Sequence, residues 1–349
     1  MKILWIGIML FFSSLCVYAG TLIKSASQSE DIKIPIVYHK EYNISFFGLE
    51  KLHTFDSQKY GKVMAELMKH FSFSVRHCFK PSKISDEELL LVHSKEYLHS
   101  LSYSSTVAQI TEMPILRSIP NFLVQWRILD PMRYATAGTV LGAELALKYG
   151  WSINLSGGYH HAKSNQGGGF CVFADIPLAI KKLRLKNNAL KVLVIDLDAH
   201  QGNGHESILA NDPLSYVFDI YSSPNYPSDY EAQHAIDFNY PVKIGIKDEE
   251  YLGILKNKLP EALEQVKPDF IIYNAGTDCY EKDKLGRMSL TKECIIQRDI
   301  FVFQQAQERK IPILMVLSGG YTGESAHIIA SSLKLILQDK IKSNNTFKR

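Results

Sequence analysis

Two aspartates and a histidine stand at alternate positions after an apolar run in the segment VLVIDLDAHQGNGHE. Asp196, Asp198 and His200 can point to one side, because a strand projects every second side chain to the same face. Asp278 follows another apolar run in the segment FIIYNAGTD. Asp198, His200 and Asp278 form a ligand set typical of catalytic zinc, in which a water completes the coordination. Such oxygen and nitrogen ligands also suit iron(II), cobalt or manganese, so the pattern predicts a metal but leaves its identity open.

Two adjacent histidines, His160 and His161, lie in a glycine-rich loop. A histidine pair in such a loop can simply be exposed to solvent. Here Asp196 is a candidate partner for one imidazole and Asn203 for the other, and such partners fix the tautomer and orientation of a histidine. Tyr321 follows a Ser-Gly-Gly turn and could donate to a developing oxyanion, although tyrosines on glycine turns are also common in cores. We therefore interpret both histidines and the tyrosine as candidate catalytic residues.

Six apolar segments of strand length would position these residues. The last five are each followed at once by polar or glycine-rich sequence. Unbroken apolar runs separated by helical patterns are typical of a parallel sheet covered on both faces, and the loops at the carboxyl ends of its strands line the ligand crevice. We predict a single-domain, open, mostly parallel α/β sheet with helices on both faces. The predicted strands cover residues 34–39, 151–156, 192–196, 216–220, 270–275 and 313–318.

Capping signals mark several helices. Asp56 precedes a helical pattern, and Ser85 and Glu88 have the spacing of a capping box. Another helical pattern has Pro131 in its first turn and ends at Gly150, which is the usual asymmetry of a helix. The predicted longer helices cover residues 56–68, 130–149, 176–186, 291–309 and 325–337.

The composition indicates a globular protein with a large core, since 46% of its 349 residues are hydrophobic and its formal net charge is only +3. We find no run of basic residues with interleaved aromatic residues, so we expect no direct binding to nucleic acid. After residue 19 the cysteines are scattered and none forms a CxxC pair, so we expect free, mostly buried thiols. These are Cys78, Cys171, Cys279 and Cys294.

The amino terminus has the pattern of a signal peptide. Lys2 precedes an apolar stretch, and the small residues Val17 and Ala19 suit a signal peptidase. The stretch is shorter than the ~20 residues that a membrane span needs, so we favour cleavage before Gly20 over an uncleaved anchor. We expect export to the periplasm or the exterior rather than a cytoplasmic location, with no stable membrane insertion after cleavage. The predicted organisation is a signal peptide over 1–19, a flexible segment over 20–31, one folded domain over 32–340 and a polar tail over 341–349.

Four motifs carry a family resemblance. In their order and spacing, GGYHHAKSNQGGGFCVFADI, IDLDAHQGNGHE, YNAGTD and SGGY resemble the zinc-dependent histone deacetylases of the arginase/deacetylase superfamily. The segments YNISFFGLEKLHTFD, TEMPILRSIPNFLVQWRILDPMR and GTDCYEKDKLGRMSL make the chain most similar to class IV, the histone deacetylase 11-like group. The likeness extends from about residue 36 to residue 337.

The resemblance implies a role for each candidate residue. One catalytic zinc would be bound by Asp198, His200 and Asp278. His161 would be the general base that takes a proton from the metal-activated water and passes it to the lysine amine, with electrostatic help from His160. Tyr321 would stabilise the tetrahedral intermediate.

Two further sites follow from the same resemblance. The acyl-lysine tunnel would be lined by Gly169, Phe170, Tyr226 and Gly320. A structural potassium ion would be held by Asp196 and Asp219, together with main-chain carbonyls of Asp198 and His200. Asn203 stands where most classes of the family carry an aspartate beside the second histidine, and this departure agrees with class IV.

The expected substrate is an acylated lysine of a protein or peptide, hydrolysed at its linear side-chain amide. Class IV enzymes are similar to one another in favouring long fatty-acyl groups over acetyl. Two alternatives stay open: a small-molecule amidohydrolase acting on acetylated polyamines, and an inactive module that binds acyl-lysine. The intact set of candidate residues argues against the inactive module, and the export signal weakens the expectation of a histone substrate more than that of deacylase activity.

Overall fold

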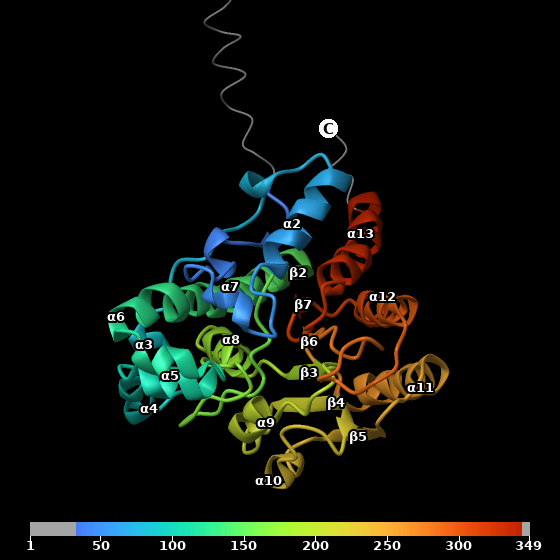
Figure 1. Cartoon of the computed structure of the whole chain (residues 1–349). Coiled ribbons are helices and arrows are strands. Elements are labelled where there is room, and N and C mark those ends of the chain that lie inside the picture. The colour runs from blue at the N-terminus through green and yellow to red at the C-terminus, as the bar shows by residue number, and fades with distance from the viewer. Residues whose placement is uncertain (1–32, 344–349) are drawn as a thin grey trace, which may run out of the picture. The chain divides into compact units, whose positions relative to one another are not determined.

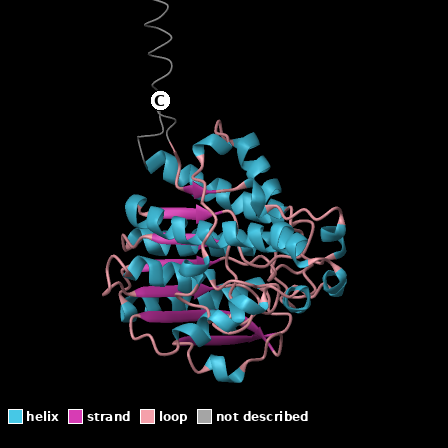
Figure 2. Cartoon of the chain, turned by 90° about the vertical axis from the view of Figure 1, so that its left-hand side faces the viewer, coloured by secondary structure: helices cyan, strands magenta, loops and turns pink. Residues whose placement is uncertain are grey.

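Seven parallel strands form one sheet in the order β1-β2-β7-β6-β3-β4-β5. The computed structural model describes residues 33–343, and within them this sheet confirms the predicted parallel α/β architecture. Figure 2 shows the strands side by side with helices around them. The strands are β1 (Ile36–Val37), β2 (Trp151–Asn154), β3 (Val192–Asp196), β4 (Ser215–Ser223), β5 (Phe238–Lys243), β6 (Phe270–Asn274) and β7 (Ile313–Val316).

Helices cover both faces of the sheet, as Figure 1 shows for α7 and α8 on one face and for α11, α12 and α13 on the other. Among residues 33–343, no helix is both long enough and apolar enough to cross a membrane. The α-helices are α2 (Lys59–His70), α3 (Asp86–Leu89), α4 (Lys95–Ser100), α5 (Ser104–Ile110), α6 (Asn121–Val124), α7 (Asp130–Tyr149), α8 (Asp175–Arg184), α9 (Asn203–Leu209), α10 (Tyr230–Gln233), α11 (Asp248–Val266), α12 (Lys292–Glu308) and α13 (Ser325–Ser343). Short 3-10 turns occupy Lys40–Tyr42, Leu49–Leu52, Val75–His77 and Pro114–Ser118.

The register of the central strands brings polar residues together at the carboxyl ends of these strands. Every residue of β2, β3, β6 and β7 is buried, which explains their unbroken apolar sequences. The last residue of β3, Asp196, lies opposite Asp219 of β4 and Asn274 of β6. The carboxyl ends of the central strands therefore place three polar side chains abreast, next to the loops that follow.

One strand was missing from the sequence prediction. β5 is the edge strand, and its residues alternate between partly buried and exposed positions over most of its length. Its sequence FNYPVK therefore has no apolar run, and Pro241 is tolerated because an edge strand has one unpaired side. The predicted strand over residues 34–39 is shorter, since only Ile36–Val37 pair with β2 and a 3-10 turn begins at Lys40.

One predicted helix start was wrong. The helix predicted at Asp56 begins at Lys59, and the Asp56 carboxylate instead accepts from the Gln58 N–H in the preceding turn. The helix predicted over residues 130–149 is confirmed as α7, and α6 and a π-helical turn over Gln125–Leu129 lead into it without a break. The widened π-helical turn changes the main-chain hydrogen bonding just before Pro131, which has no N–H to donate. The Ser85–Glu88 capping box and the Gly150 terminus are present as predicted.

Both ends of the chain lie partly outside the described residues. The predicted signal peptide and residues 20–31 lie outside the described residues. α13 extends to Ser343, into the region of the predicted polar tail, and residues 344–349 lie outside the described residues. The four cysteines after residue 19 are buried and form no disulfide within the described residues, as expected.

Candidate active site

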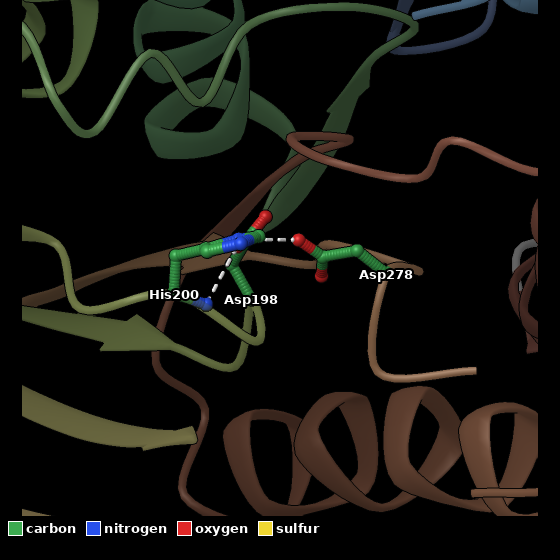
Figure 3. Close-up of side chains that lie close together, drawn as sticks. All are labelled: Asp198, His200 and Asp278. Atoms are coloured by element: carbon green, nitrogen blue, oxygen red, sulfur yellow. Dashed lines mark hydrogen bonds and ion pairs between the residues drawn. The ribbon is translucent and has the colours of Figure 1, made fainter. Parts of the chain in front are cut away.

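Asp198, His200 and Asp278 meet at the carboxyl ends of β3 and β6, as Figure 3 shows. The His200 Nδ1 lies 2.8 Å from Asp278 Oδ2 and 3.1 Å from Asp198 Oδ1. One donor atom from each residue lies within 4.8 Å of the other two, and all three side chains are buried. Three ligand atoms that converge in the interior form a candidate metal centre.

The surroundings fit a bound cation. Burial, together with the negative charge of Asp198, raises the pKa of Asp278 to about 7, so Asp198 opposes the ionisation of Asp278. A Cβ atom at Gly319 would lie 2.6 Å from Asp198 Oδ2 and from Asp278 Oδ2. The glycine therefore lets the main chain pack closely against both carboxylates. Two buried carboxylates and one imidazole match the donor set of a catalytic zinc site.

His160 and His161 lie beside this cluster with different partners. The His160 Nδ1 is 2.9 Å from Asp196 Oδ2, and the His161 Nδ1 is 2.9 Å from Asn203 Oδ1. Burial lowers the pKa of His160, but the charges of Asp196 and Asp198 outweigh burial and raise it to about 9. Burial and the charge of His160 lower the pKa of His161 well below its usual value. The pair thus combines a charged imidazole with a neutral one.

Asp175, the first residue of α8, holds the histidine loop in place. Its carboxylate accepts from the N–H groups of Gly158 and Tyr159, both at 2.8 Å, and from Thr139 Oγ1 at 2.6 Å. The sequence reasoning did not assign this residue a role. An aspartate at the start of a helix after a glycine loop was the available signal, but it equally suits an ordinary first turn.

A pocket that is partly open to solvent reaches the two histidines. Of the predicted tunnel residues, Gly169 and Phe170 line it, as does Tyr321. A Cβ atom at Gly169 would lie 2.4 Å from the His161 ring, so this wall requires glycine. Tyr226 and Gly320 are not among the lining residues. The Tyr226 ring instead lies edge-on to His161, with centroids 4.9 Å apart.

The far part of the pocket is apolar. Its lining includes Met132 and Ala135 of α7, Ile128 of the π-helical turn before α7, and Ile44 and Met113 of earlier turns. An extended hydrocarbon chain attached to the reacting amide would meet mostly carbon atoms here.

Two buried basic side chains, Lys59 and Arg298, bind main-chain carbonyls in the loops of the site, and neither was predicted from the sequence. Lys59 on α2 donates to the carbonyls of Ser318 and Gly319, at 2.7 and 2.9 Å, in the turn before Tyr321. Burial lowers its pKa to about 8. Arg298 on α12 is fully buried and bridges the loops that carry the metal-ligand carboxylates. Both residues lie in helices, where a basic side chain usually indicates a solvated face.

A second acidic cluster lies behind His160. Asp196 and Asp219 occupy neighbouring positions on β3 and β4, and Glu206 of α9 joins them. Burial raises the pKa of Glu206 to about 7 and also raises that of Asp219. One oxygen of each of these two carboxylates is buried without a hydrogen-bond partner among the described residues. Glu206 was absent from the sequence prediction.

The fold and site define a parallel α/β protein with a buried Asp-His-Asp cluster beside a histidine pair. Residues 53–336 match the model of the histone deacetylase domain, and the chain belongs to the histone deacetylase family. Histone deacetylase 2 of Arabidopsis thaliana is 45% identical over 302 residues, covering 86% of this chain and 78% of that protein. Histone deacetylase 1 of Homo sapiens is 25% identical, with 85% and 63% covered. The solved HDA15 HD domain shares the fold, with a TM-score of 0.68 at 19% identity, covering 88% of this chain and 89% of that one.

Proposed function

We propose that this chain is a zinc-dependent lysine deacylase of the class IV type that favours long fatty-acyl groups. The observation that carries the proposal is the buried cluster of Asp198, His200 and Asp278 next to an apolar pocket that reaches His160 and His161. The cluster supplies the metal ligands, the histidines supply acid-base groups, and the pocket supplies room for an acyl chain.

Each side chain around the cluster has a separate role in the proposed hydrolysis. Zinc bound there would polarise the amide carbonyl and make a water molecule more acidic. His161, held neutral, accepts the proton of the water at Nε2 and later donates it to the lysine amine. His160, held charged between Asp196 and Asp198, adds positive charge near the developing oxyanion. The Tyr321 hydroxyl, on the pocket wall, donates a hydrogen bond to that oxyanion.

The substrate test uses the mature protein loaded with zinc. Turnover of acetyl-lysine peptides, myristoyl-lysine peptides and acetylated polyamines is compared at equal concentrations. We expect the highest kcat/KM for the myristoyl peptide, because the apolar lining of the pocket offers contacts to a long chain. Preferred hydrolysis of polyamines would identify a small-molecule amidohydrolase. Binding of acyl-lysine without turnover would identify an inactive binding module.

A structural potassium ion between Asp196 and Asp219 is also part of the proposal. The unpartnered oxygen of Asp219 and the neighbouring buried carboxylates support it, because a cation would offset their mutual repulsion. If potassium binds there, replacing it with a larger organic cation such as tetramethylammonium should lower the thermal stability at constant ionic strength.

We further propose that residues 1–19 direct export and are removed before a domain that covers residues 32–340. The support is the order of Lys2, an apolar stretch and the small residues Val17 and Ala19. Amino-terminal sequencing of protein from the exported fraction should start at Gly20. Recovery of only the full-length chain from the cytoplasm would contradict export.

A further inference from the structure

Asp229 lies directly behind Asn203, the residue that contacts His161. The Asn203 Nδ2 donates to Asp229 Oδ2 at 3.0 Å, and the Lys163 Nζ donates to the same oxygen at 2.6 Å. Burial raises the pKa of Asp229, but the hydrogen bonds from Lys163 and Asn203 outweigh it and lower that pKa. Asp229 is therefore an ionised carboxylate, which can only accept hydrogen bonds.

This contact decides which way the Asn203 amide points. An ionised carboxylate cannot donate, so the amide nitrogen must face Asp229 and the amide oxygen must face His161. The oxygen lies 2.9 Å from His161 Nδ1 and can only accept. The proton of the neutral imidazole is therefore on Nδ1, and Nε2 is left as an acceptor.

Asp229 is itself fixed from several sides. Its other oxygen accepts from the Ala232 N–H at 3.2 Å and caps α10. Its main-chain N–H and carbonyl bind the side-chain amide of Gln201, at 3.1 and 3.0 Å. Lys163 belongs to the loop that carries His161, so its ion pair also joins the two loops. Because Asp229 is bound at both carboxylate oxygens and at its main chain, its position is fixed, and it determines the orientation of the Asn203 amide.

We propose that Asp229 acts through Asn203 as a positioning residue for His161, holding the imidazole in the tautomer whose Nε2 can accept a proton. The inference rests on the proposed function, in which His161 is the general base. Asp229 touches neither the substrate nor the reacting atoms in this arrangement. Its contribution is to exclude the tautomer in which Nε2 carries the proton.

The direct test is Lys163→Met/Asp229→Asn, because the Lys163 ammonium would otherwise hold the new amide oxygen toward itself and Asn203. Without Lys163, the cap of α10 still requires an oxygen toward the Ala232 N–H, so the substituted side chain turns its NH₂ group toward Asn203. The Asn203 amide then turns its oxygen to that group and its own NH₂ group to His161 Nδ1, which moves the imidazole proton to Nε2. We expect kcat to fall about 10- to 100-fold, as for other outer partners of catalytic histidines, while KM changes little.

Lys163→Met is the matched control, because it removes the other donor to the same oxygen and leaves the Asp229 carboxylate in place. Its loss of kcat should be clearly smaller. An equal loss in both variants would show that the ion pair between the loops matters, and would overturn the tautomer role. The double variant Asn203→Asp/Asp229→Asn exchanges amide and carboxylate. It should keep a kcat close to that of the parent protein, because a carboxylate beside His161 can only accept from Nδ1.

The tautomer is read independently of turnover by ¹⁵N NMR of histidine-labelled, zinc-loaded full chain. The chain has 12 histidines, so the His161 signals are assigned by difference from His161→Ala. We expect an unprotonated Nε2 in the parent and in Lys163→Met, and a protonated Nε2 in Lys163→Met/Asp229→Asn. An unchanged tautomer in Lys163→Met/Asp229→Asn would overturn the proposal. Failure of the proposed function would appear separately, as absent turnover in the parent protein with intact NMR signals.

Discussion

Two arginines hold backbone carbonyls at opposite ends of the same sheet. Arg184 lies at the amino ends of β3 and β4, where it donates to the Leu190 carbonyl and to Ser215 Oγ, both at 3.0 Å, and pairs with Asp212. Arg298 lies at the carboxyl ends of β3 and β6, where its Nη1 donates to the carbonyls of Leu197 and Gly276, at 2.9 and 2.7 Å. Its charge is balanced by Asp299.

The difference lies in what the held segments carry. The carbonyls held by Arg298 immediately precede the turns with Asp198 and Asp278, whereas Arg184 closes a local set of hydrogen bonds with no candidate site residue in it. Around Arg184, opposite charges are paired. Above Arg298, two buried carboxylates face each other beside a histidine. The contacts at the amino ends of the strands thus stabilise the fold. At the carboxyl ends, buried carboxylates lower stability but form a site at the crevice of the parallel sheet.

The largest effect on activity should come from Asp278→Asn at the carboxyl end. The substitution is nearly isosteric but removes one anionic ligand, so hydrolysis should fall to background while the fold is kept. Elemental analysis of the purified parent protein and variant, together with turnover and circular dichroism, checks this. Unchanged turnover in the variant, or a parent protein purified without metal, would remove the metal assignment.

Arg298→Lys should come next. A lysine keeps the positive charge but cannot donate to both carbonyls and Asp299 with the geometry of a guanidinium. The loops bearing Asp198 and Asp278 would lose their common support, and zinc affinity should fall about 10- to 100-fold. Competition with a zinc chelator measures this without any substrate. Unchanged affinity would show that the two loops are held by their other contacts.

Arg184→Lys is the counterpart at the amino end. It should lower the free energy of unfolding by about 1 to 3 kcal/mol, because hydrogen bonds from a charged group to Leu190 and Ser215 are lost. Zinc affinity and kcat/KM should stay at their parent values. Denaturant unfolding and the same chelator competition provide the comparison. A loss of zinc affinity equal to that of Arg298→Lys would contradict the division between the two ends.

Some residues of the site could be predicted from local sequence patterns, and others could not. Asp198, His200 and Asp278 were predictable because each follows an apolar strand at its carboxyl end, so one local pattern placed all three. Asp229 and Arg298 were not predictable, because an aspartate before a short helix and an arginine within a helix are usually exposed. Only the packing of α12 and the meeting of two distant loops give them their partners. The edge strand β5 was missed since its burial pattern lacks an apolar run.

The smallest change in rate at neutral pH is expected for Asn203→Asp, which alters the partner of His161. In the parent, burial and the charge of His160 lower the pKa of His161, so the imidazole stays neutral, and competent as a base, into mildly acidic solution. A carboxylate 2.9 Å from Nδ1 would favour the imidazolium and raise that pKa. A base with a higher pKa is protonated at a higher pH.

The acidic limb of the kcat/KM profile should therefore move upward in Asn203→Asp, by up to ~1 to 3 pH units. The same direction is expected in Asn203→Asp/Asp229→Asn, where the number of carboxylates is unchanged and one has moved next to the imidazole. A shift confined to the single variant would point to the added net charge rather than to the contact. An acidic limb that stays in place in both variants, with zinc bound and substrate turned over, would mean that Asn203 does not tune the general base.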